Sequence, residues 1–208
     1  MQRAIDTQVQ DDERVSEMRA RIVEAAIVVF RRKGFHQATT RMIADEAQVT
    51  QSNIYNYVRN KDDILYLVCE RLVGLYNKGL DEAVEAHEDP YERLIEALRG
   101  VIEVMFIHRE ELVLLYNETH ALEKADRKLI LKAVARFTRQ FQDLLDAYVA
   151  AGGSVRIGNR RIAANLLTFV PAIVALRWWD LSIYSDRAEA SEAIFAFILG
   201  GLGIPAPG

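Results

Sequence analysis

Helical periodicity extends over almost the whole chain, and this feature restricts the fold more than any other. From Ser16 to Gly201, apolar residues recur at the spacing of an α-helix, and no Asn-Gly or Asp-Gly turn separates alternating strands. Only 4 of the 208 residues are proline and 11 are glycine, so few positions can break a helix. These patterns predict an all-α protein of about nine helices.

The first predicted helix covers Ser16 to Lys33. Its apolar residues Ile22, Ala26 and Val29 lie on one stripe, and the glycine that follows Lys33 can end the helix. The preceding residues, 1–15, are polar and acidic, and we expect them to form a flexible tail.

Two short helices are predicted next, separated by a turn at Gln48 and Val49. Thr40 is expected to cap the first of them, and Thr50 is expected to cap the second, which has the sequence QSNIYNY. Each is shorter than the roughly 12–15 residues that an isolated helix needs, so both must pack against the first helix. The spacing predicts a helix-turn-helix over residues 40–57.

The second short helix carries a polar surface without acidic residues. Glutamine and asparagine amides can pair with adenine, serine can bond to several base edges, and tyrosine hydroxyls can reach phosphates. The side chains of this surface are Gln51, Ser52, Asn53, Tyr55, Asn56 and Tyr57. The surface therefore predicts a helix that contacts bases in the major groove of DNA.

The charge of the chain is divided unevenly along its length. The whole chain has a net charge of -4, but residues 1–13 carry -3, residues 14–61 carry +5, and residues 62–208 carry -6. A basic segment attached to an acidic body indicates a module that contacts a polyanion. By the charge count alone, an ordinary variation of surface charge remains the alternative.

The segment TTRMIADEAQVTQSNIYNYVRNKDDIL resembles the signature of the tetracycline-repressor family, and the similarity covers about residues 16–65. The resemblance implies a ligand-responsive transcriptional regulator, specifically a repressor, that binds a palindromic operator in double-stranded DNA as a homodimer. It also implies a DNA-binding domain over 16–62 and a ligand-binding and dimerisation domain over 63–208.

The resemblance also implies roles for individual residues. Thr40 would contact phosphate, Arg41 would contact a base edge or the backbone, and Lys61 would clamp a phosphate. Bases would face Thr50, Gln51, Ser52 and Asn53, while Tyr55, Asn56 and Tyr57 would contact both bases and phosphates. The family usually has glycine where Gln48 stands, and a left-handed backbone there would cost about 1 kcal/mol.

The acidic body is predicted to contain further helices after a break at residues 87–90. Pro171 should kink one of them. The expected helices cover residues 62–86, 91–111, 111–122, 125–151, 159–184 and 187–200.

The helices over 159–184 and 187–200 are too apolar for one subunit to cover them fully. In the family this position forms a four-helix dimer interface, which implies a homodimer through these two helices. Burial in the core of a single chain is the alternative. No stretch is expected to span a membrane, and a cytoplasmic protein is expected because Cys69, the only cysteine, allows no internal disulfide.

A small hydrophobic effector is expected in the body. Large apolar residues with a few polar ones are candidates to line its cavity, although core packing is the alternative for each: Met105, Phe106, Tyr116, His120, Phe137, Phe141, Asn165, Phe169 and Trp178. The layout of residues 91–122 is similar to that of relatives that respond to acyl-coenzyme A. For such a ligand, the basic residues that would meet its phosphates include Arg99, Arg136, Arg139 and Arg177.

The sequence offers little for other functions. It contains no GxSxG, P-loop or HExxH motif, so we expect no enzyme and no cofactor. His108 with Glu110 and Glu111, or Glu118 with His120, are conceivable metal ligands, but charged residues on helix surfaces explain them more simply. A helical DNA-binding protein without an effector is the main alternative, and an enzyme is the other.

Overall fold

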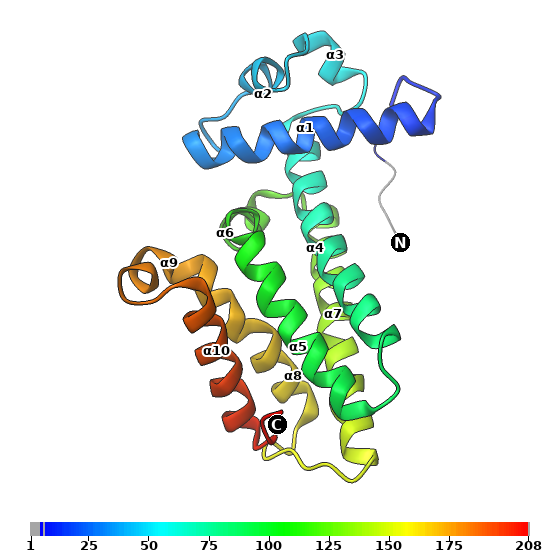
Figure 1. Cartoon of the computed structure of the whole chain (residues 1–208). Helices are drawn as coiled ribbons and strands as arrows, with labels where there is room; N and C mark the ends of the chain where they lie inside the picture. Colours follow the sequence, from blue (N-terminus) through cyan, green and yellow to red (C-terminus); the bar gives the residue numbers. More distant parts are fainter. Residues whose placement is uncertain (1–4, 6, 208) are drawn as a thin grey trace. The chain divides into compact units, whose positions relative to one another are not determined.

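The computed structural model describes Ile5 and residues 7–207 (Figure 1). Within this part of the chain there are α-helices and two short 3-10 helices but no strand, so the predicted all-α fold is confirmed. The elements in order are α1 (Asp12–Lys33), α2 (Thr40–Glu46), α3 (Gln51–Tyr55), α4 (Lys61–Glu85), α5 (Pro90–Ile107), α6 (Arg109–Glu118), η1 (Thr119–Ala121), α7 (Lys124–Ala150), α8 (Arg160–Phe169), η2 (Val170–Ala172), α9 (Ile173–Tyr184) and α10 (Arg187–Leu202).

The chain forms two compact units. The first, here called the DNA unit, contains residues 1–72 and 113–132, and the second, here called the body, contains residues 73–112 and 133–208. Helices α4, α6 and α7 each contribute residues to both units. The predicted domain boundary between residues 62 and 63 remains a prediction.

Helix α1 of the DNA unit begins at Asp12, four residues before the predicted start. The Asp11 carboxylate accepts hydrogen bonds from the backbone nitrogens of Glu13 and Arg14, and Asp12 and Glu13 place further negative charge in the first turn. Residues 12–15 are therefore helical, contrary to the tail predicted over 1–15, of which residues 1–4 and 6 lie outside the described part of the chain. The helix ends at Gly34, whose φ of 75° agrees with its predicted role as a stop.

The core of the DNA unit lies where α1 supports α2 and α3. Ile22 and Val29 of α1, Ile43 of α2 and Ile54 of α3 are completely buried. Figure 1 shows α2 over the C-terminal half of α1 and α3 over its N-terminal half. Because α2 and α3 are too short to be stable alone, this packing holds the helix-turn-helix together.

The core of the body is formed by α5 with α8, η2 and α10. Asp89 caps α5 and Pro90 occupies its first turn, as the break at 87–90 predicts. Small buried residues on α8 and η2, such as Ala163 and Ala172, allow close packing of the helices. The completely buried Leu98 provides the matching apolar surface on α5.

The helix predicted over 159–184 is interrupted at Pro171. The chain forms α8, then the 3-10 turn η2, then α9, and α9 itself is irregular at Arg177 (φ -131°, ψ 16°). Pro171 lacks the backbone N–H of a regular helix, so the predicted kink is confirmed. By length and composition alone, Arg160–Tyr184 is apolar enough to cross a membrane, but a single segment of this kind is weak evidence for a span, and 39% of its most apolar window is buried.

Candidate nucleic-acid interface

Helix α2 is capped by Thr39, not by Thr40. The Thr39 backbone is extended (φ -119°, ψ 155°), and its hydroxyl accepts a hydrogen bond from the Met42 backbone nitrogen at 3.2 Å. The prediction that Thr40 caps this helix was wrong, because both adjacent threonines can cap a helix and only the backbone geometry distinguishes them. Thr40 is the first helical residue, and its hydroxyl is available to α3.

The turn between α2 and α3 follows the prediction closely. Gln48 has a φ of 54°, which is the left-handed backbone expected where the family usually has glycine. The Val49 nitrogen donates to Ala44 O at 3.0 Å, and Arg21 of α1 donates to Gln48 O at 3.3 Å. Thr50 caps α3 as predicted, since its hydroxyl accepts a hydrogen bond from the Asn53 nitrogen.

Three of the predicted DNA-contacting side chains meet between α2 and α3. Gln51 Nε2 donates to Thr40 Oγ1 at 3.0 Å, and Thr40 Oγ1 lies 3.0 Å from the Tyr55 hydroxyl. We call Thr40, Gln51 and Tyr55 the Thr40 cluster. Its hydrogen bonds orient the Gln51 amide and the Tyr55 ring at the surface before any DNA is present, which lowers the entropy cost of binding.

The other predicted residues of this surface are accessible, with one exception. Arg41, Thr50 and Ser52 are exposed like Gln51 and Tyr55, and Asn53 and Asn56 are half-buried. Tyr57, in contrast, is only 2% exposed, and the neighbouring Val58 is completely buried. The prediction that Tyr57 contacts DNA was wrong, because the chain leaves α3 at Asn56 and turns into the core.

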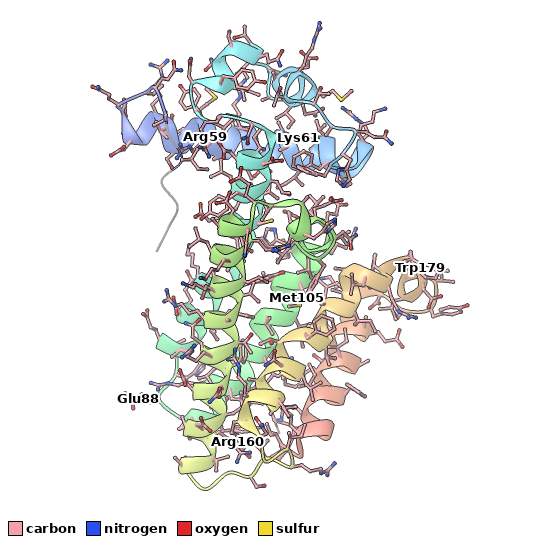
Figure 2. All side chains as sticks on the ribbon, turned by 180° about the vertical axis from the view of Figure 1, so that it is seen from behind. Arg59, Lys61, Glu88, Met105, Arg160 and Trp179 are labelled. Carbon is pink, nitrogen blue, oxygen red and sulfur yellow. The ribbon has the colours of Figure 1, made fainter. Side chains whose placement is uncertain are left out.

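Lys61 does not have the free ammonium group that a phosphate clamp requires. Its Nζ donates to the carbonyl oxygens of Phe35 (2.7 Å), His36 (3.2 Å) and Ala38 (2.9 Å), and it lies 4.4 Å from the centre of the Phe35 ring. An ammonium group has three N–H donors, so these three carbonyls satisfy it. In this structure Lys61, labelled in Figure 2, holds the loop that leads into α2, and its predicted contact with a phosphate stays a prediction.

Other basic residues of the DNA unit also bond inside it. Arg59 forms a two-pronged ion pair with Asp63, whose side chain is 1% exposed, and hydrogen bonding to Asp63 followed by its charge raises the pKa of Arg59. Arg19 and Arg21 of α1 donate to backbone carbonyls. The net charge of residues 14–61 predicts a segment that contacts a polyanion, whereas Arg19, Arg21 and Arg59 bond within the unit. Only the Arg59–Asp63 spacing of four residues, typical of a helical ion pair, indicated otherwise.

Two of the candidate ligand residues line a small cavity in the body. Phe137 and Phe141 are buried and line a cavity of about 10 Å³ between α4, α5 and α7, together with Tyr76 and Val101 among others. This volume is enough for about one water molecule. A small-molecule ligand would need roughly 300 Å³ or more, so binding there requires the helices to move apart.

The remaining candidates lie elsewhere. Met105 and Phe106 are buried in the core, where the Phe106 ring packs edge-on against Trp178 with ring centres 5.2 Å apart. Four other candidates do not line an enclosed cavity because their side chains are exposed: Tyr116 and His120 in the DNA unit, and Asn165 and Phe169 in the body.

Two larger hollows open at the surface of the body. One of about 340 Å³ lies between α5 and α10 and is lined by Arg99, Gly100, Ile102, Glu103, Ser191 and Phe195. Arg99 pairs there with Glu192 at 2.9 Å, and Glu103 pairs with Arg187, so the basic residues at this hollow are already neutralised. The other hollow, of about 270 Å³, is apolar and is lined by Ile157, Leu166, Leu167, Val170, Phe197, Ile198, Gly201 and Leu202.

The conceivable metal ligands do not gather into a site. His108 Nδ1 lies 3.1 Å from Glu111 Oε1, as a helical pair with a spacing of three residues. Among the residues that the structure describes, no three His, Cys, Asp or Glu side chains lie close enough together to hold a metal ion.

Large apolar residues are exposed on α8, α9 and α10. Trp179 is 73% exposed and projects from α9 in Figure 2, and Phe197 of α10 is 69% exposed. The other large apolar residues exposed on these helices are Ile162, Leu166, Phe169, Ile173, Leu176, Ile183 and Tyr184. We call this set the α8–α10 face. Apolar surfaces of this kind usually mark a site where another molecule binds.

Family models match both parts of the chain. The model described as bacterial regulatory proteins of the tetR family matches residues 22–66, and the model described as the C-terminal domain of tetracyclin repressor-like proteins matches residues 87–202. The chain is also 29% identical over 196 residues to the HTH-type transcriptional regulator HbdR of Aromatoleum sp. (strain CIB), covering 94% of this chain and 85% of that protein.

Solved structures agree with the fold. A bacterial regulatory protein in the tetR family from Rhodococcus RHA1 superimposes with a TM-score of 0.80 at 22% identity, covering 90% of this chain and 98% of that one. AibR, solved in complex with isovaleryl coenzyme A and operator DNA, gives a TM-score of 0.72 at 16% identity, covering 86% and 96% of the two chains. At these identities the similarity establishes the fold alone.

Proposed function

The chain belongs to the tetR family of bacterial transcriptional regulators, and from this premise we propose that it is a repressor that binds a palindromic operator as a homodimer. In this proposal a small hydrophobic effector, of the acyl-coenzyme A class, releases it from DNA in the cytoplasm. The single observation that carries the DNA-binding part is the Thr40 cluster, since it presents oriented hydrogen-bonding groups on an α3 without acidic residues.

DNA recognition is assigned to α3 and the start of α2. Gln51, Ser52 and Asn53 at the N-terminal end of α3 would contact base edges, and Thr50, Tyr55 and Asn56 would contact bases and phosphates. Arg41 is exposed on α2 and forms no hydrogen bond or ion pair with the described residues, so it is our candidate for the main charged contact with phosphate. Thr40 would contribute by holding Gln51 and Tyr55 in place.

Dimerisation is assigned to the α8–α10 face. A second copy would cover Phe197 and the other exposed apolar residues, as an isologous contact requires the same patch on both subunits. The apolar hollow of about 270 Å³ offers a place for side chains of the partner. Two-fold symmetry would then present two copies of α3 to two half-sites about 34–36 Å apart.

The effector is assigned to the region of the small cavity beside Phe137 and Phe141. The complex of AibR with isovaleryl coenzyme A supports this ligand class, and the aromatic lining supports an acyl group. Because the cavity holds only about 10 Å³, binding must displace α4, α5 or α7. Helix α4 is continuous with Lys61, which holds the loop before α2, so a displacement of α4 would lower DNA affinity by linkage.

The experiment begins with selection of a duplex by the purified protein from random-sequence DNA, followed by fluorescence anisotropy. We expect a palindromic site whose affinity falls about 10³–10⁵-fold between 50 and 200 mM salt, if the dimer makes about 6–10 contacts with phosphates. Failure to enrich any sequence would contradict the proposal. Thr40→Val should weaken binding to the selected duplex, whereas the matched control Thr138→Val, on α7 in the body, should leave it unchanged.

The effector is tested separately with defined ligands. Isovaleryl, octanoyl and palmitoyl coenzyme A are added to the complex of the protein with the selected duplex, with free coenzyme A as the control. Release by an acyl form but not by free coenzyme A would support the proposal. A protein that binds the duplex but gives no release and no thermal shift with any of these ligands would favour the alternative, a helical DNA-binding protein without an effector.

A further inference from the structure

The described residues that precede α1 pack against the end of α3. Ile5 is 5% exposed, although it lies within the segment expected to be a flexible tail. Thr7 Oγ1 and the Gln8 backbone nitrogen both donate to the carbonyl oxygen of Asn56, each at 2.9 Å. The Thr7 hydroxyl also accepts a hydrogen bond from the Val9 nitrogen at 3.1 Å, which fixes the local turn.

Arg19 of α1 joins the same two segments from the other side. Its Nε and Nη2 donate to the Tyr57 carbonyl at 3.2 and 3.1 Å, and Nη2 also donates to the Ile5 carbonyl at 2.7 Å. The side chain is half-buried, and burial lowers the pKa of Arg19 despite the opposing charges of Glu70 and Asp63. The guanidinium group is therefore committed to backbone carbonyls inside the DNA unit.

These contacts matter because α3 is very short. A helix of five residues leaves its last carbonyl groups without helical partners, and it has almost no stability of its own. The carbonyls of Asn56 and Tyr57, directly after α3, receive their hydrogen bonds from Thr7, Gln8 and Arg19. The N-terminal end of α3 is fixed by its cap and by the Thr40 cluster, so both ends of the helix are held.

We propose that Ile5, Thr7, Gln8 and Arg19 form an N-terminal clasp that positions α3 for DNA binding. They act as positioning residues and do not contact DNA. Without the clasp, the C-terminal end of α3 with Asn56 is free to move, and only a fraction of the molecules has the geometry that binds the operator. The apparent affinity falls by that fraction. This inference rests on the proposed function, DNA binding through α3.

The test compares matched variants on the duplex selected by the wild-type protein. Thr7→Val removes the hydroxyl and keeps the shape, while Thr7→Ser keeps the hydroxyl. Arg19→Met removes the guanidinium group and keeps the apolar stem. We expect Thr7→Val to weaken binding about fivefold, because one lost hydrogen bond changes an equilibrium by about this factor. Thr7→Ser should bind like the wild type. Arg19→Met loses several hydrogen bonds and should weaken binding about tenfold or more.

Salt dependence separates positioning from direct contact. If Arg19 binds no phosphate, the slope of log affinity against log salt stays the same in Arg19→Met, although the affinity falls. A slope reduced by about 0.9 for each lost contact would show that Arg19 neutralises phosphate, and the clasp would be wrong. Wild-type affinity in both Thr7→Val and Arg19→Met would also overturn it.

Hydrogen exchange of the free protein tests the clasp without DNA. In Thr7→Val and Arg19→Met, amides of residues 53–58 should exchange faster than in the wild type and in Thr7→Ser, while those in α10 should not change. If the wild-type protein selects no duplex, the proposed function fails. The exchange result then still decides whether the clasp holds α3, and unchanged exchange at 53–58 would reject it.

Discussion

The DNA unit and the α8–α10 face of the body use their most characteristic residues in opposite ways. The DNA unit contains the basic segment of the chain, yet Arg19, Arg21, Arg59 and Lys61 bond to carbonyls or to a buried carboxylate within the unit. The body contains the most apolar helices, yet Trp179 and its neighbours are exposed. Composition alone therefore does not say whether a residue acts inside its unit or toward a partner.

The difference follows from the length of the elements. Short helices expose many carbonyl groups at their ends, and cationic side chains can satisfy several carbonyls at once. Helices α8, α9 and α10, with 10, 12 and 16 residues, form more of their own backbone hydrogen bonds than α2 and α3, so their side chains are free to form a surface. In this protein the basic residues stabilise loops and turns of the DNA unit, and the apolar residues of α8–α10 provide a face for another copy in the proposed dimer.

The largest effect is expected from a substitution that disrupts the α8–α10 face. Phe197→Glu places a charge in the proposed interface, where an unpaired buried charge costs several kcal/mol. We expect a monomer in analytical ultracentrifugation and a loss of operator affinity of at least about 100-fold. Leu131→Glu is the control, because Leu131 is an equally apolar residue on α7 with 55% exposure. A dimeric Phe197→Glu protein would refute the assignment.

The next effect concerns direct base recognition. Gln51→Ala removes an exposed amide at the start of α3, and we expect a loss of about 1–3 kcal/mol in discrimination at one base position. Binding titrations against single-base variants of the selected duplex measure it. Gln37→Ala, an exposed glutamine in the loop before α2, should leave discrimination unchanged. Equal effects of the two variants would contradict recognition by Gln51.

Lys61→Met tests whether Lys61 stabilises the DNA unit or contacts DNA directly. It leaves the carbonyls of Phe35, His36 and Ala38 without their shared donor, so we expect operator affinity to fall about tenfold while the salt slope stays constant. Anisotropy titrations over a range of salt concentrations give both quantities. A slope lower by about 0.9 per contact would restore the phosphate role that the sequence predicts for Lys61.

The smallest expected effect lies in the interior of the DNA unit. Burial raises the pKa of the Cys69 thiol from 9.0 to about 12, so the native state favours the neutral thiol. The contribution of this pKa difference to the free energy of unfolding is fully present below pH 9. It is lost as the pH rises from 9 to about 12. At pH 10 this loss of stability is about 1.4 kcal/mol.

Chemical denaturation at pH 7 and pH 10 measures this effect. Cys69→Ala costs stability at pH 7, because it leaves a small cavity, but it lacks the titration. The difference in unfolding free energy between the wild type and Cys69→Ala should therefore shrink at pH 10. A constant difference would mean that the Cys69 thiol has an ordinary pKa.

The sequence was sufficient for the helix-turn-helix and for most of the helices, whereas the DNA-contacting residues stay a prediction. The apolar spacing, the Thr50 cap and the left-handed Gln48 depend on local rules, so each could be predicted. The small size of the cavity beside Phe137 and Phe141 could not be predicted, because residues far apart in sequence determine how a cavity is filled.

The features that the sequence did not reveal have a common physical cause, since each depends on the partner or the direction of a polar side chain. Thr39 and Thr40 are equally good caps, and the direction of Tyr57 is set by the path of the chain after α3. Lys61 finds its acceptors 23 to 26 residues away in the sequence. Helix propensity and periodicity carry no information on such distant partners.

The left-handed backbone of Gln48 affects how the DNA-binding motif of this protein can evolve. A side chain held in the left-handed region means that the DNA-binding motif is below its greatest attainable stability. The single substitution Gln48→Gly would relieve that strain and raise the free energy of unfolding by about 1 kcal/mol. The backbone carbonyl of residue 48 would still accept its hydrogen bond from Arg21. A glycine at this position could therefore offset the loss of stability that new base-contacting residues on α3 cause.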